Sequence, residues 1–83
     1  MAPDAPAVLV RRMFALFRDA GITDRPARLA VCSFILWRPI GSSNDLTGLE
    51  VRHVVDTLAF WKQVGALQYR CGRVVESLAV PSV

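Results

Sequence analysis

The segment 27–37, ARLAVCSFILW, places the strongest constraint on the fold, because it is apolar on nearly every side. Thr23 or Asp24 can cap a helix that contains this segment, and Pro39 prevents the helix from continuing. The pattern therefore predicts a helix over about 24–37. A helix that is apolar all round is normally the buried centre of a small domain. We expect the other elements to pack around it.

An amphipathic helix is predicted before this segment, over about 5–20. Asp4 can cap its start, and Gly21 can end it in the left-handed conformation that glycine adopts without strain. Its apolar residues recur at helical spacing and are expected to face the core. They are Leu9, Met13, Leu16, Phe17 and Ala20.

A third helix is predicted after the segment, over about 48–64. Thr47 and Glu50 have the spacing of a capping box, in which each side chain bonds the backbone N–H of the other residue. Gly65 is placed to end the helix. The expected buried side again follows helical spacing. It consists of Val51, Val54, Val55, Leu58 and Trp61.

The remaining segment, over about 66–80, is predicted to form a β-hairpin. Its two halves, ALQYR and RVVESLAV, contain β-branched and aromatic residues typical of strands, and Cys71 and Gly72 stand at the position of the turn. Since 83 residues are too few for two independent cores, residues 1–83 are expected to form one domain. The predicted fold is mainly α with a C-terminal β-hairpin, a winged-helix-like three-helix domain.

Composition favours an anionic partner and argues against catalysis. The net charge is +3, and nine of the ten basic residues are arginine, whose planar fork suits phosphate and carboxylate. Cys32 and Cys71, with His53 as the one histidine, make no zinc pattern, so no metal or other cofactor is expected. No phosphate-binding glycine loop and no nucleophile with a base is visible. The start lacks a signal peptide and no apolar run is long enough to span a bilayer, so we expect a cytoplasmic protein that is not an enzyme.

The order of three helices and a hairpin is that of a winged helix-turn-helix, which places its third helix in the major groove of duplex DNA and its wing on the backbone. Donors occur where such a reader needs them, in the loop before the third helix, on that helix and beside the hairpin turn. The predicted DNA-binding residues are Ser42, Ser43, Arg52, His53, Lys62, Arg70 and Arg73. This interpretation predicts a role in transcription control or recombination.

The alternative is a protein-interaction module that docks on a host or phage protein, as an inhibitor or a homodimer. A hydrophobic content of 53% leaves little polar surface on so small a chain, which favours a partner for part of its apolar surface. Trp37, Phe60 and Trp61 are the largest apolar side chains that could serve it, although the core is the expected place for each. The arginines would then be a plain solvated surface.

Residues 13–62 resemble a short helical module of actinobacterial phage proteins, where it is appended to recombination or replication proteins. The resemblance rests on the order of four short runs: Gly21-Ile22-Thr23-Asp24-Arg25, then Arg28-Leu29, then Ser42-Ser43 with Asp45-Leu46-Thr47, and last Val55-Asp56-Thr57-Leu58. Trp37 stands where the module has glycine. The resemblance implies a phage origin, a host bacterial cytoplasm and a nucleic-acid setting, and it leaves a protein partner open.

Overall fold

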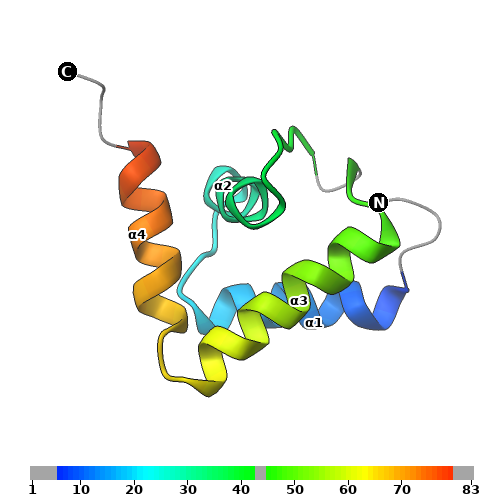
Figure 1. Cartoon of the computed structure of the whole chain (residues 1–83), viewed down its shortest axis with the longest axis horizontal. Coiled ribbons are helices and arrows are strands. Elements are labelled where there is room, and N and C mark those ends of the chain that lie inside the picture. The colour runs from blue at the N-terminus through cyan, green and yellow to red at the C-terminus, as the bar shows by residue number, and fades with distance from the viewer. Residues whose placement is uncertain (1–5, 43–44, 80–83) are drawn as a thin grey trace.

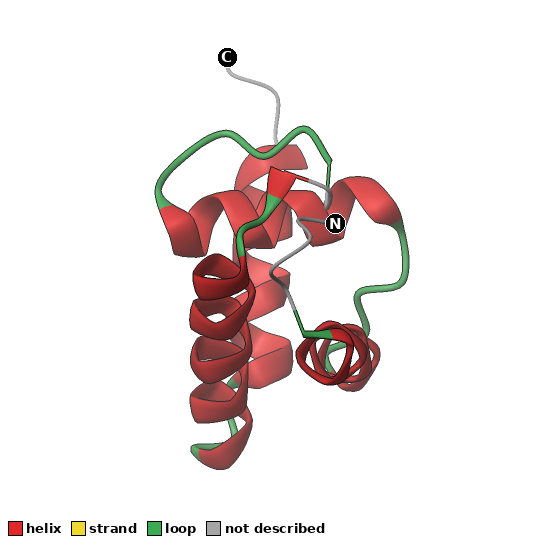
Figure 2. Ribbon diagram, turned by 90° about the vertical axis from the view of Figure 1, so that its right-hand side faces the viewer, coloured by secondary structure: helices red, strands yellow, loops and turns green. Residues whose placement is uncertain are grey.

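In the computed structural model, which describes residues 6–42 and 45–79, the chain forms four helices and, within those residues, no strand (Figure 1). The helices are α1 (Ala7–Asp19), α2 (Arg25–Leu36), α3 (Gly48–Gln63) and α4 (Leu67–Ala79). Helix α3 packs against each of the other three, and α4 also packs against α2. Helix α2 is seen end-on in Figure 1 and lies across the upper part of the molecule in Figure 2.

Local sequence signals explain where α1 and α3 end. Helix α1 begins at Ala7, slightly later than predicted, and its expected cap Asp4 lies outside the described residues. Gly21 follows it with φ 79°, and the N–H groups of Gly21 and Ile22 donate to carbonyls of the last turn. Gly65 follows α3 in the same way with φ 74°. Both ends are Schellman motifs, which confirms the two predicted glycine stops.

Helix α2 has the predicted cap at its start and an unusual residue at its end. The Asp24 carboxylate accepts a hydrogen bond from the N–H of Ala27 at 3.3 Å. The helix ends at Leu36, and Trp37 follows in the left-handed conformation with φ 58°. Glycine usually occupies that position, since a side chain there costs backbone energy. The side chain of Trp37 is nevertheless 93% exposed, so burial does not compensate for that cost.

The predicted capping box opens α3 and is part of a larger network. The Thr47 hydroxyl accepts from the N–H of Glu50 at 3.1 Å, and the Glu50 carboxylate accepts from the N–H of Thr47 at 3.0 Å. The same carboxylate accepts two hydrogen bonds from Arg38, at 2.6 and 2.7 Å. Arg38 also donates to the backbone carbonyl of Asp45 at 2.9 Å. One guanidinium therefore ties the loop between α2 and α3 to the start of α3.

Because Arg38 forms an ion pair with Glu50, the stability of the fold depends on pH in the acid range. Hydrogen bonds from the Arg38 side chain, and then from the Thr47 backbone, lower the pKa of Glu50 from 4.5 to about 2. A lowered pKa contributes stability above the ordinary value, and that contribution is lost as the pH falls toward 2. We expect Glu50→Gln, which keeps a capping amide, to lower the melting temperature at pH 7 and to match the unsubstituted protein near pH 2. Melting curves across that range test this, and a constant difference at every pH would contradict it.

The C-terminal segment corrects the fold prediction, because residues 67–79 form a helix instead of a β-hairpin. Leu67, Cys71 and Val74 are all buried, and their spacing of four and three residues is that of one helix face. The N–H of Arg70 donates to the carbonyl of Ala66 at 2.8 Å, which is a helical bond at the start of the segment. Burial of this face against α2 and α3 outweighs the strand preference of the individual residues. The domain therefore has no wing among its described residues, and the winged-helix class is wrong.

A substitution at Gly72 distinguishes the observed helix from the predicted hairpin by experiment. Gly72 lies inside α4, and a Cβ atom added there meets no heavy atom within 4 Å. Alanine in a helix interior is about 1 kcal/mol more favourable than glycine, so Gly72→Ala is expected to raise the free energy of unfolding by about that amount. Urea unfolding measures the change. A hairpin turn that needs positive φ at residue 72 would instead be destabilised.

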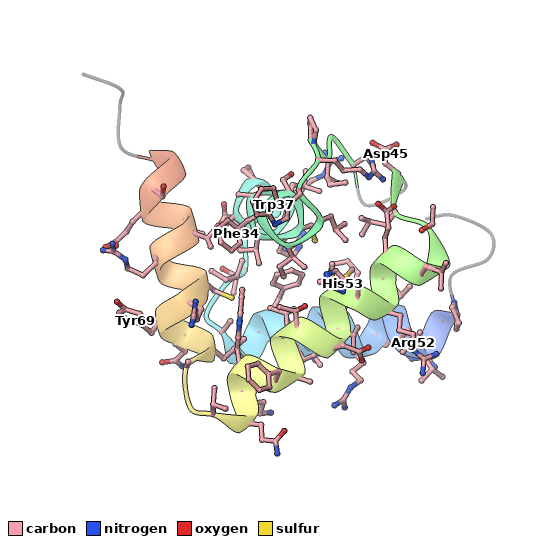
Figure 3. All side chains as sticks on the ribbon, viewed as in Figure 1. Phe34, Trp37, Asp45, Arg52, His53 and Tyr69 are labelled. Carbon is pink, nitrogen blue, oxygen red and sulfur yellow. The ribbon has the colours of Figure 1, made fainter. Side chains whose placement is uncertain are left out.

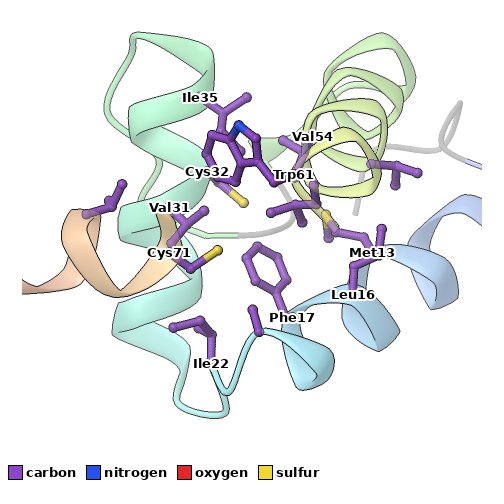
Figure 4. Packing of buried hydrophobic residues seen from close by; sticks show 14 of the residues in the cluster. Met13, Leu16, Phe17, Ile22, Val31, Cys32, Ile35, Val54, Trp61 and Cys71 are labelled. Atoms are coloured by element: carbon purple, nitrogen blue, oxygen red, sulfur yellow. The ribbon is translucent and has the colours of Figure 1, made fainter. Parts of the chain in front are cut away.

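The core lies where the four helices meet, and Figure 4 shows most of it. The predicted α1 stripe is buried except for Leu9, which is half-buried, and all five predicted residues of α3 are buried. Trp61 is 8% exposed as expected, but Trp37 and Phe60 are exposed, contrary to prediction. Trp37 comes after the last turn of α2, and Phe60 lies on the side of α3 that faces away from Leu58. Helix α2 is not buried all round either, because Phe34 within it is 56% exposed.

Candidate functional site

The residues predicted to bind DNA are spread over the molecule. Arg52 and His53 are exposed on the first half of α3, and Figure 3 shows Arg52 at the opposite end of the molecule from α4. Arg70 and Arg73 are exposed on α4, one turn apart on a helix where a wing tip was expected. Because residues 67–79 form a helix, the expected contact of a wing with the DNA backbone has no structural basis.

The other predicted residues do not complete a surface. The Lys62 ammonium lies 2.7 Å from the Asp19 carboxylate, and this contact lowers the pKa of Asp19. Both side chains are about half exposed, so the pair contributes little to stability. Ser42 is half-buried in the loop before α3, and Ser43 lies outside the described residues. The set is thus not brought together within the described residues.

A different group of four arginines lies on α1 and in the first turn of α2. We call it the arginine face, and it consists of Arg11 and Arg18 on α1 with Arg25 and Arg28 on α2. On α1 the two arginines flank Phe14, three residues before it and four residues after it, so all three share one side of the helix.

Phe14 joins the two halves of the arginine face. The Arg28 guanidinium lies 5.3 Å from the centre of the Phe14 ring, and it donates to the carbonyl of Thr23 at 2.7 Å. Arg25 and Arg28 line the same small cavity as Phe14. The turn between the helices is short, which holds the end of α1 beside the start of α2. The arginine face is therefore built from two helices around a half-buried aromatic ring.

None of the arginines of the arginine face forms an ion pair within the described residues, although the pKa of Asp19 is lowered mainly by Lys62 and to a smaller extent by the charge of the neighbouring Arg18. The ion pairs there join Arg38 to Glu50, Lys62 to Asp19, and Arg73 to Glu76. Asp24, next to Arg25 in sequence, accepts a hydrogen bond in capping α2. The face presents guanidinium groups that are available to an external anion.

Arg25 and Arg28 add positive charge at the start of α2, where the capping carboxylate of Asp24 offsets part of that charge. Arg25 is the first residue of α2, where the helix dipole places positive charge, and the first turn contains no acid. Arg28 is three residues further on, so the two like charges are neighbours on the helix surface. A bound anion would reduce the repulsion that remains.

Sequence reasoning missed the arginine face, although part of the signal was present. Arg11 and Arg18 are seven residues apart, which is two helical turns, and Arg25 and Arg28 are three apart. These spacings place each pair on one helix side. Nothing in the sequence shows that the two sides meet, because that depends on how α2 is placed relative to α1.

The rest of the described chain offers little for catalysis. Burial raises the pKa of both Cys32 and Cys71 to about 11, so neither thiol is an activated nucleophile at neutral pH. The described residues include no group of three or more His, Cys, Asp or Glu side chains that could hold a metal ion. None of the four helices is long and apolar enough to cross a membrane, in the part of the chain described here. A cytoplasmic location stays a prediction.

The resemblance of residues 13–62 to the phage module also stays a prediction. Its function has to be inferred from where the fold places the side chains of this chain. Comparison with protein-family models, with curated proteins and with solved structures finds no match.

Proposed function

We propose that the protein binds nucleic acid, with duplex DNA as the favoured form, through the arginine face and without catalysis. The observation that supports this most is the set of four arginines around Phe14 that lack ion pairs within the described residues. Guanidinium groups bind phosphate oxygens through paired N–H donors, and such charge-assisted bonds are stronger than neutral ones. The proposal keeps the partner expected from the sequence and moves the site from the predicted third helix, its preceding loop and the wing to α1 and α2.

The spacing of the arginine face suits a phosphate backbone. Arg11 and Arg18 are two helical turns apart, about 10 Å along α1. One strand of duplex DNA presents a phosphate about every 3.4 Å of its axis, so α1 spans about three phosphates. Arg25 and Arg28 add two donors from the start of α2. Contacts of this kind set position and affinity, whereas sequence is read by groups at the base edges. We therefore expect binding with weak sequence preference.

Salt dependence tests the proposal directly. If four phosphates are neutralised, the logarithm of affinity should fall with the logarithm of salt with a slope of about 3.6, a loss of roughly two decades between 50 and 200 mM. Fluorescence anisotropy with a labelled 20-base-pair duplex of mixed sequence measures this slope. A single strand of the same length should give a shallower slope, about 2.8. No binding to either form at 50 mM salt would overturn the proposal.

A further inference from the structure

A groove runs between α2 and α4, away from the arginine face. It has a volume of about 480 Å³ and is lined by Ala30, Ser33 and Phe34 from α2, Trp61 from α3, and residues of α4. Figure 3 shows Phe34 between α2 and α4. Pockets that bind ligands or peptide side chains typically measure about 300–1,000 Å³. The groove is therefore large enough to receive more than one apolar side chain.

The groove combines an apolar lining with positive charge. Trp61 and Val74 are core residues that reach its surface, and Phe34 is 56% exposed beside them. The charged residues among its described lining residues are Arg70 and Arg73, and the exposed Glu76, which is not one of them, lies 3.8 Å from the Arg73 guanidinium. The Arg70 guanidinium lies 5.9 Å from the centre of the Trp61 ring, so a positive charge stands directly over the apolar part. Arg70 and Arg73 are the two predicted wing residues, here placed on the edge of a groove.

Trp37 extends the apolar surface beyond the groove. It lies three residues after Phe34, at the same end of α2. Its ring is 93% exposed and its backbone is in the strained left-handed region. Exposed aromatic groups next to a pocket are typical of protein-binding surfaces. Strain at an exposed residue likewise points to a role other than folding.

We infer that this groove binds an acidic amphipathic helix of a partner protein. Apolar side chains of that helix would pack on Trp61 and Phe34, and carboxylates beside them would pair with Arg70 and Arg73. The charge of the groove identifies the partner as acidic. A second copy of this chain fits poorly, because a symmetric contact would place the same arginines against one another. A nucleic acid fits less well than a protein, since apolar side chains form the floor.

The inference goes beyond nucleic-acid binding, because the two sites use different residues. The arginine face includes the start of α2, and Phe34 and Trp37 lie at the other end of that helix. The protein would then hold an acidic protein segment and a nucleic acid at the same time. Failure of one site leaves the other intact, so separate binding measurements distinguish them.

Selection from a display library tests the groove before any natural partner has been identified. The library consists of 16-residue helix-forming peptides with randomised charges and randomised apolar positions, and the intact protein is the target. We expect enriched peptides to be net negative and to carry large apolar residues at spacings of three and four. Absence of enrichment, or enrichment of basic peptides, would overturn the inference. Displacement of the enriched peptides by single-stranded oligothymidylate alone would instead show a nucleic-acid groove.

Three variants show whether the enriched peptides occupy the groove. Arg70→Glu reverses a charge at the groove, and Arg52→Glu makes the same change on α3. We expect Arg70→Glu to weaken peptide binding at least about tenfold and Arg52→Glu to change it by less than about threefold. A third variant, Ala30→Trp, fills the groove without changing charge and should also weaken binding. Equal binding by all three variants would contradict the inference, with thermal melting as the check that each is folded.

Tryptophan fluorescence reports peptide binding in the groove directly. Trp37→Phe leaves Trp61 as the single tryptophan, and Trp61 lines the groove. A bound peptide without tryptophan should shift the Trp61 emission to shorter wavelength, because it excludes water from the ring. Saturating binding with no change in this emission would place the peptide elsewhere and overturn the inference.

Discussion

The double substitution Arg18→Glu with Arg25→Glu is expected to weaken duplex DNA binding at least about 100-fold at 50 mM salt, which is about 2.7 kcal/mol. Each arginine contributes a charge-assisted hydrogen bond to phosphate worth about 1.5–3 kcal/mol, and each new carboxylate repels the backbone. The slope of log affinity against log salt should also become shallower by the contribution of about two phosphates. Anisotropy with the same labelled duplex measures both quantities.

The double substitution should leave the stability of the fold almost unchanged. Arg25 begins α2, where a negative charge is favourable, so Arg25→Glu stabilises that helix by about 0.3–1 kcal/mol. Arg18 is in the last turn of α1, where a positive charge is favourable, so Arg18→Glu has a cost of similar size. The two effects offset each other. Loss of binding with an unchanged melting temperature would assign the effect to the arginine face.

A matched control separates the arginine face from the net charge. Arg52→Glu with Arg70→Glu also replaces two exposed arginines, and both double variants change the net charge from +3 to −1 because each replacement subtracts two. We expect the control to lose less than about tenfold in DNA affinity, through the weaker overall field. Equal losses in the two double variants would show that DNA responds only to net charge. The proposed site would then be wrong.

The helix ends and the faces of α1 and α3 were predictable because their causes are local. Gly21 and Gly65 fix the stops, and Thr47 with Glu50 fixes a start, through bonds between residues a few positions apart. The prediction of a hairpin after Gly65 was wrong because it used residue preference in place of spacing. Leu67, Cys71 and Val74 already follow a helical period, and tertiary burial of that face decides the outcome.

The two proposed binding surfaces were less accessible to sequence reasoning. Arg70 and Arg73 were recognised as a pair, but the groove beside them exists only because α4 packs against α2. The arginine face likewise requires the Arg28 side chain on α2 to reach the Phe14 ring on α1. The exposure of Trp37 depends on its place just beyond the last turn of α2, and an apolar residue at a helix end reads in sequence like any core residue. Such features arise from contacts between distant segments, which single-sequence patterns do not encode.

Leu46→Ala is expected to lower the free energy of unfolding by about 3–4 kcal/mol. Leu46 is a loop residue, yet its side chain is fully buried and lines the small cavity that also contacts Phe14, Arg25 and Arg28. Truncating a buried leucine removes its transfer energy and leaves a cavity that the surroundings fill only partly. The free energy of unfolding of a native protein is typically about 5–15 kcal/mol, so this loss is a large share of the stability.

Leu49→Ala is the matched control for Leu46→Ala, because it makes the same substitution three residues later on a side chain that is 81% exposed. We expect it to change the free energy of unfolding by less than about 0.5 kcal/mol. Urea unfolding of both variants, with equal slopes, measures the difference. Similar losses would mean that the loop is not anchored by Leu46. A larger loss at Leu46 would show that this loop residue supports the packing beneath Phe14, Arg25 and Arg28. Leu46→Ala should then also weaken DNA binding at temperatures close to its melting transition.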